Sequence, residues 1–63
     1  MADGTAIEWT DLDKFKSVER EVAMRKSAYP KWVASGRIKQ EVAAREIAIM
    51  EAIAADYRKR MLA

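Results

Sequence analysis

The sequence predicts an all-α protein, a two-helix antiparallel hairpin that pairs with a second copy into a four-helix bundle homodimer. Apolar residues recur at heptad spacing across residues 38–61, which is typical of a long helix in a bundle. Thr10 precedes a second helical pattern, and Pro30 and Gly36 interrupt the chain between the two. Two helical segments around one interruption favour a hairpin over residues 10–63.

The composition argues against catalysis. The chain has 63 residues with neither cysteine nor histidine, so thiolate metal sites, disulfides and the usual Ser/His and Cys/His pairs are missing. We therefore expect no enzyme activity, cofactor, metal ion or small-molecule substrate. No apolar run reaches the ~18 residues of a membrane span, so no membrane contact is expected.

The first nine residues are expected to form a flexible N-terminal arm. Apolar residues in segment 1–9 are too sparse for a helix, although Ile7 and Trp9 could fold back onto the hairpin. Thr10 then stands three residues before Asp13, the spacing of a capping box. The first helix is therefore expected to begin directly after Thr10.

The first helix is expected at about residues 11–28. Its apolar residues at helical spacing are Phe15, Val18 and Val22. Pro30 disfavours α conformation at Tyr29, so the helix should end or kink near Ala28. Residues 30–36 then have two interpretations: a short separate helical turn, or a kinked continuation of the first helix to Ser35.

Both interpretations place the chain reversal at Gly36, with a left-handed backbone conformation there. The second helix is expected at about residues 38–61, without a good N-cap. Arg37 and Lys39 put positive charge at its start, which is unfavourable for the helix dipole.

The second helix carries a heptad seam, the apolar row expected to form the core. It consists of Ala43, Ile47, Met50, Ala54, Tyr57 and Met61. Val42, Ile49 and Ile53 form a second apolar row beside it. The combined face is too wide for one partner helix, and a lone hairpin of this size has little core. Both arguments favour self-association.

A cluster of basic and aromatic residues is expected at the tip of the hairpin. It contains Arg25, Lys26, Tyr29, Lys31, Trp32, Arg37 and Lys39. Charge interleaved with aromatic rings is typical of nucleic-acid surfaces. Alternatively, the cations complement the helix dipole and the rings cap the end of the bundle. We favour the second interpretation because the net charge is only +2.

About two-thirds of the chain resembles a group of short, uncharacterised proteins encoded in bacteriophage and prophage genomes. The resemblance covers residues 19–25, 29–37 and 45–53, and its most distinctive residues are Tyr29, Pro30, Trp32, Val33, Gly36 and Arg37. In that group a Thr usually stands at the position of Lys39, where it would cap the second helix. The group has no established activity, so the resemblance implies a phage context and no mechanism.

The expected function is that of a small accessory protein in the cytoplasm of a bacterial host. It would act through protein–protein contact with a host or phage protein, including host defence factors. Two alternatives remain open at this stage. One is a nucleic-acid-binding accessory protein that uses the tip, and the other is a bare oligomerisation or assembly element.

Overall fold

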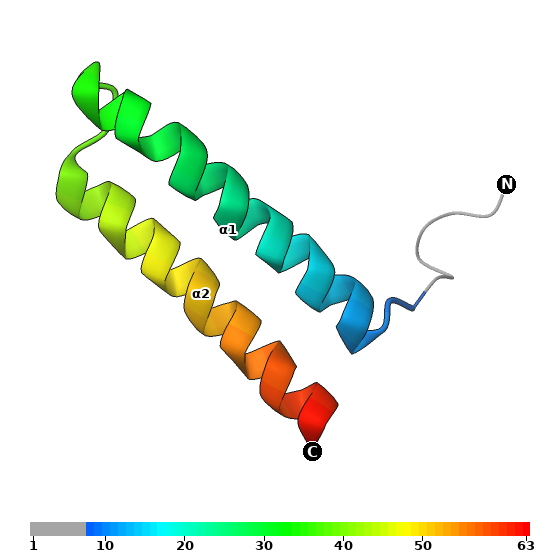
Figure 1. Ribbon diagram of the computed structural model, residues 1–63. Coiled ribbons are helices and arrows are strands. Elements are labelled where there is room, and N and C mark those ends of the chain that lie inside the picture. Colours follow the sequence, from blue (N-terminus) through cyan, green and yellow to red (C-terminus); the bar gives the residue numbers. More distant parts are fainter. Residues whose placement is uncertain (1–7) are drawn as a thin grey trace, which may run out of the picture.

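The computed structural model describes residues 8–63, which form two helices joined by one short turn. Helix α1 spans Asp11–Ala34 and helix α2 spans Gln40–Leu62, and the two run antiparallel side by side (Figure 1). The described part of the chain contains no strand, so the prediction of an all-α hairpin is confirmed. Of the expected arm, residues 1–7 lie outside the described residues.

Helix α1 begins with the expected capping box. The Thr10 hydroxyl accepts a hydrogen bond from the Asp13 backbone N–H at 3.0 Å. In return, the Asp13 carboxylate accepts one from the Thr10 backbone N–H at 3.2 Å. Asp11 in the first turn also lies 3.5 Å from Arg60 near the end of α2, which fits an antiparallel pair with an acidic start and a basic end.

Helix α1 continues through Pro30 to Ala34, so of the two interpretations of residues 30–36 the continuation of the first helix is the one observed, and the end near Ala28 is wrong. Residues 30–34 belong to the same helix and do not form a separate short one. Proline removes one backbone hydrogen bond and crowds the preceding turn, and this local cost favoured an earlier end. The turn beyond Pro30 lies beside α2, since Val33 lines a groove together with Ala43 and Ile47 of α2.

The chain reverses in a Schellman motif centred on Gly36. The Arg37 N–H donates to the Trp32 carbonyl at 2.8 Å, and the Gly36 N–H donates to the Val33 carbonyl at 3.1 Å. Gly36 has φ +80°, which confirms the predicted left-handed conformation. A side chain at this position would therefore be strained by the backbone alone.

Helix α2 begins later than expected, at Gln40 instead of about residue 38. Lys39 occupies the N-cap position with an extended backbone, φ −78° and ψ 150°, and makes no side-chain capping hydrogen bond. The predicted lack of a good N-cap is confirmed. The helix ends at Leu62, one residue beyond the expected end.

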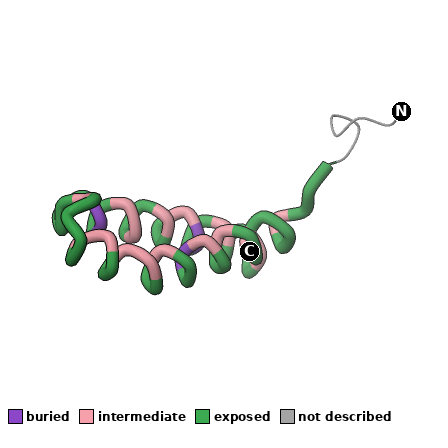
Figure 2. Tube along the Cα trace, turned by 90° about the horizontal axis from the view of Figure 1, so that it is seen from above, coloured by how far each residue is buried: buried purple, intermediate pink, exposed green. Residues whose placement is uncertain are grey.

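The core lies along the line of contact between the helices and is thin (Figure 2). Only Val22, Ala43 and Ala54 are buried, and no large side chain in the described part of the chain is fully buried. Most of the other residues predicted for the core or for self-association are half-buried, namely Phe15, Val18, Ile47, Met50, Ile53, Tyr57 and Met61, whereas Val42 and Ile49 are exposed. The heptad seam of α2 therefore faces α1 within the same chain.

Candidate interaction surfaces

One broad side of the hairpin carries large apolar residues from both helices. Ile53 of α2 lines a groove together with Ser17 of α1 and Trp9, and the α1 rim of this groove also carries charged residues, namely Asp13, Lys14, Lys16 and Arg20. Val42 and Ile49 precede Ile53 by eleven and four residues, so helical periodicity puts them on the same side of α2. We call this side of the molecule the apolar face.

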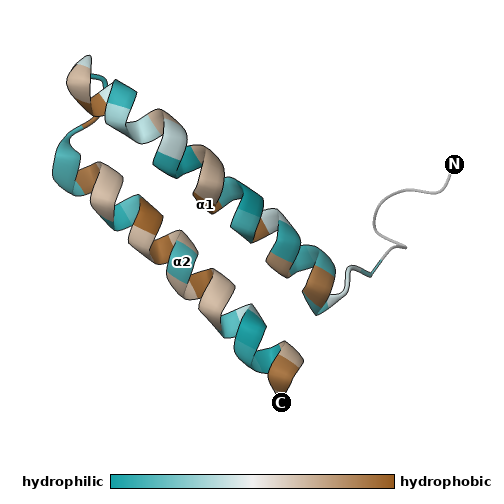
Figure 3. Cartoon of the chain, in the orientation of Figure 1, coloured by the Kyte–Doolittle hydropathy of each residue, from teal (hydrophilic) through white to brown (hydrophobic). Residues whose placement is uncertain are grey.

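Met24 of α1 lies at the outer edge of the apolar face, because it follows Ser17 by seven residues but stands about 200° round the helix from the buried Val22. Among residues 8–63, six large apolar side chains are exposed, and four of them lie on this face or at its edge. These four are Trp9, Met24, Val42 and Ile49, with exposed fractions between 41% and 62%. The hydropathy of the two helices is drawn in Figure 3. Ile53 in the same row is half-buried.

The opposite broad side is covered by charged groups. Lys26 Nζ lies 2.7 Å from Glu51 Oε2 across the two helices, and both side chains are about half exposed. Arg58 lines a groove on this opposite side together with Lys26 and Glu51. It also lies over the Phe15 ring, 5.6 Å from its centroid. The contrast between the two sides makes the apolar face the stronger candidate for a protein contact.

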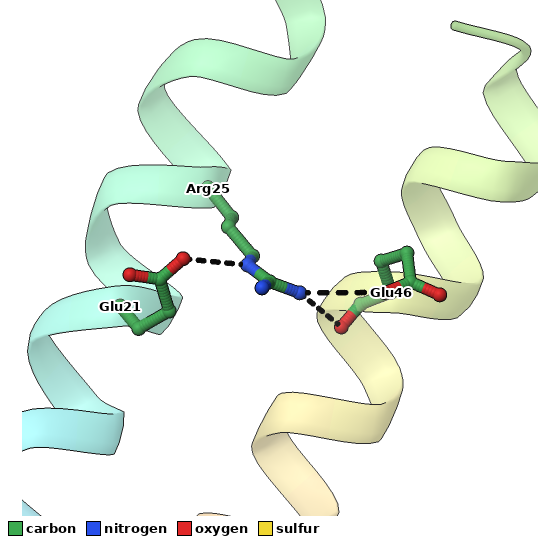
Figure 4. Close-up of polar contacts among 3 residues, drawn as sticks. All are labelled: Glu21, Arg25 and Glu46. Carbon is green, nitrogen blue, oxygen red and sulfur yellow. Dashed lines mark hydrogen bonds and ion pairs between the residues drawn. The ribbon is translucent and has the colours of Figure 1, made fainter.

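An ion-pair cluster lies on the apolar face between the two helices (Figure 4). Arg25 Nε is 2.9 Å from Glu21 Oε1, and Arg25 Nη1 is 3.5 Å from Glu46 Oε1. The same Nη1 donates to the Glu46 backbone carbonyl at 3.4 Å. The hydrogen bond to Glu21 raises the pKa of Arg25 above its ordinary value, so the guanidinium stays charged.

The Arg25 side chain is only 21% exposed. Its charge is already matched by carboxylates of its own chain, so a partner could cover it without supplying a new counter-charge. The i,i+4 spacing of Glu21 and Arg25 is enough to predict their pair, whereas the pair with Glu46 joins two helices and has no such local spacing. The available signal was Glu46 itself, an acidic residue that interrupts the apolar row of α2 on the side that faces Arg25 of α1.

The tip of the hairpin is smaller and less basic than expected. Arg25 and Lys26 form ion pairs with α2 and do not contribute free charge to the tip. Among residues 8–63, no ion pair is formed by Lys31, Arg37 or Lys39. Three cations therefore remain of the predicted five.

The aromatic residues of the tip contact each other and nearby arginines. The Tyr29 and Trp32 rings lie 5.3 Å apart at 35°. Arg37 lies over the Trp32 ring at 4.9 Å from its centroid, and Arg25 over the Tyr29 ring at 5.9 Å. These four residues form a stack along the end of α1, and the Trp32 ring already has two neighbours.

Comparisons with known proteins gave no match: no family model, curated protein or solved structure is similar to this chain. Within residues 8–63, His, Cys, Asp and Glu side chains form no group of three that could hold a metal ion. Neither helix in the described part of the chain has an apolar stretch long enough to cross a membrane. The functional argument rests on the two surfaces described above.

Proposed function

We propose that this chain is a small non-enzymatic accessory protein that acts by protein–protein contact through a self-associating helical hairpin. The observation that carries the proposal is the apolar face, which leaves Met24, Val42 and Ile49 more than two-fifths exposed. Exposed large apolar side chains gathered on one side of a molecule typically mark a protein contact.

The thin core supports the same proposal. Within residues 8–63, the buried residues are Val22, Ala43 and Ala54, which have small or medium-sized side chains and are spread along one line of contact. Small domains with so little buried apolar surface usually need disulfides, a metal or oligomerisation. The chain has no cysteine, so a disulfide is excluded. Self-association would add the missing apolar burial.

A phage context for this function comes from the resemblance carried by residues 29–37. A protein of this kind would act in the cytoplasm of a bacterial host, and its partner would be a host or phage protein. Host defence factors are among the candidate partners. The fold alone does not select one partner, because helical hairpins serve many functions.

A second candidate function is nucleic-acid binding by the tip. It is favoured by the cations of Lys31, Arg37 and Lys39, which form no ion pair within residues 8–63. Two observations argue against it. The net charge is only +2, and the Trp32 ring that would stack on a base already contacts Tyr29 and Arg37. A bare assembly element is the third candidate and needs no further partner.

Affinity capture separates these candidates. The tagged chain is recovered from bacterial host cells with and without nuclease treatment, beside a Lys31→Ala/Lys39→Ala control. We expect a protein partner that survives nuclease and is still captured by the control. Recovery that is lost with nuclease, or with the two lysines, would establish the nucleic-acid function. Recovery of this chain alone would indicate an assembly element.

A further inference from the structure

We infer that the apolar face is covered by the same face of a second copy, with α1 of each copy packed on α2 of the other. This inference rests on the proposed self-association and identifies the surface that performs it. The supporting observations are the size of the face, the distribution of large and small side chains on it, and the position of its ion pairs.

The face has the area that a stable dimer needs. Helices of 23 and 24 residues are each about 35 Å long at ~1.5 Å per residue. Two helices packed ~10 Å apart present a face about 20 Å wide, or roughly 700 Å². Stable interfaces bury ~800 Å² per partner. One broad side of the hairpin therefore provides an interface of ordinary size.

The side chains select which helix packs on which. On the apolar face, α1 presents the small residues Ser17 and Ala28, with Glu21 and Arg25 of the ion-pair cluster between them. Helix α2 presents large residues, and its row consists of Val42, Ile49 and Ile53. Layers pack without voids when large side chains oppose small ones. Packing α1 on α2 of the second copy sets Ser17 and Ala28 against this bulky row, whereas α2 on α2 would oppose two bulky rows.

The charges select the same arrangement. Arg25 and Glu46 lie at the same level of the hairpin, since they pair at 3.5 Å. When α1 packs on α2 of the second copy, Arg25 lies at the same height along the bundle as Glu46 of the second copy. Opposite charges therefore meet across the interface. A centred α2-on-α2 contact would instead bring Glu46 to the level of Asp56 of the second copy, because α2 is centred on Glu51.

The arrangement fixes where the two tips lie. Packing α1 on α2 across a two-fold axis requires that axis to run parallel to the helices, so both tips lie at the same end of the bundle. The cations of Lys31, Arg37 and Lys39 are exposed there. At physiological salt their repulsion is screened over about 8 Å and costs little.

Sedimentation equilibrium of Ile49→Glu tests the surface, with Leu12→Glu as the matched control. Leu12 is 48% exposed and Ile49 is 41% exposed, but Leu12 lies off the apolar face. The wild type and Leu12→Glu should sediment at twice 7.2 kDa. Ile49→Glu should weaken association by about 100-fold or more, since a charge in an apolar interface is costly.

If the Ile49→Glu variant dimerises as tightly as the Leu12→Glu variant, the inference that the apolar face forms the interface is overturned. The proposed self-association would remain intact. A monomeric wild type would instead remove the proposed self-association itself. Because the separated Ile49→Glu chain could also lose its fold, a second measurement uses an intact dimer. The chain contains no cysteine, so Ser35→Cys gives a single site for a spin label at the tip.

The label-to-label distance in the Ser35→Cys dimer tests the arrangement. Two tips at one end of the bundle should give a distance within the bundle width, about 20 Å. Tips at opposite ends would lie a helix length apart, ~35 Å, and that result would overturn the inferred packing of α1 on α2.

Discussion

Trp32 acts through both its backbone and its side chain at the end of α1. Its carbonyl accepts hydrogen bonds from the Arg37 N–H at 2.8 Å and from the Ser35 hydroxyl at 3.1 Å. Its ring contacts Tyr29 and Arg37. In a Schellman motif these positions, Trp32 and Arg37, usually make an apolar contact. Here a cation–π contact between Trp32 and Arg37 takes that place, so these two residues of the tip contribute to the chain reversal.

Gly36 gives the first prediction, at the residue scale. Gly36→Ala should lower the free energy of unfolding by about 1–2 kcal/mol, because its φ of +80° is unfavourable for an L-residue. No atom lies within 4 Å of a Cβ built there, so the effect would be backbone strain alone. Urea denaturation measures it, with Gly36→Asn as a milder control. Equal stability of Gly36→Ala and wild type would refute a left-handed residue at the reversal.

The two helices differ in how their first turns are satisfied. Thr10 and Asp13 form reciprocal hydrogen bonds at the start of α1. Lys39 at the start of α2 makes no such bond and places a cation at the positive end of the helix dipole. The start of α2 is therefore a site where a substitution can raise the stability of the native protein.

Lys39→Thr should raise the free energy of unfolding by about 1 kcal/mol. The backbone at Lys39 already has N-cap geometry, so a Thr hydroxyl could accept a hydrogen bond from the first turn of α2. Urea denaturation should show the midpoint rising with an unchanged slope. Lys31→Thr serves as a control for the loss of one tip cation. An equal effect of both changes would mean that charge, and not capping, is responsible.

Sequence patterns predicted the helices well and the end of α1 poorly. The capping box and the glycine reversal depend on local backbone chemistry, which is readable from Thr10 and Gly36. The passage of α1 through Pro30 has no local signal, and the turn beyond it, with Val33, lies beside Ala43 and Ile47 of α2, which are close only in the fold. Tertiary packing outweighed the proline penalty there.

The candidate surface was only partly predictable for a similar reason. The row of Val42, Ile49 and Ile53 follows from helical spacing. Which flank of α1 joins that row depends on the hand of the turn, so Met24 could not be assigned to it. For the tip, five cations were expected to be free, but interhelical pairing occupies Arg25 and Lys26.

At the scale of the whole molecule, the hairpin has one apolar row that packs inside the chain and one that does not. Ile47 and Ala43 lie against α1, whereas Ile49 and Val42 are exposed on the same helix. The first row holds the two helices together. In the proposed assembly, the second row holds two copies together and adds the burial that the thin core lacks.

Ile47→Asp should destabilise the protein strongly, by roughly 2–5 kcal/mol, because it places a carboxylate in the contact between the helices. Ala48→Asp, one residue further on the exposed side of α2, should cost less than ~1 kcal/mol. Circular dichroism during thermal unfolding compares the two. Similar melting temperatures for both variants would mean that the seam does not hold the hairpin together.

Nucleic-acid binding should be weak. With three cations free of ion pairs among residues 8–63 and a net charge of +2, duplex DNA should bind no tighter than about micromolar at ~150 mM salt. Fluorescence anisotropy across a salt series measures this, with Lys31→Ala/Arg37→Ala as the comparison. Tighter binding, with a log–log salt slope that flattens by about two in the double variant, would favour the nucleic-acid candidate.

The dependence of thermal unfolding on protein concentration tests the central claim most directly. If a second copy completes the core beside Val42 and Ile49, dilution should separate the copies and lower the melting temperature of the helical signal. We expect the midpoint to fall steadily as the concentration is reduced through the micromolar range. A cooperative melt whose midpoint is the same at every concentration would show that the hairpin folds alone, and would contradict the account.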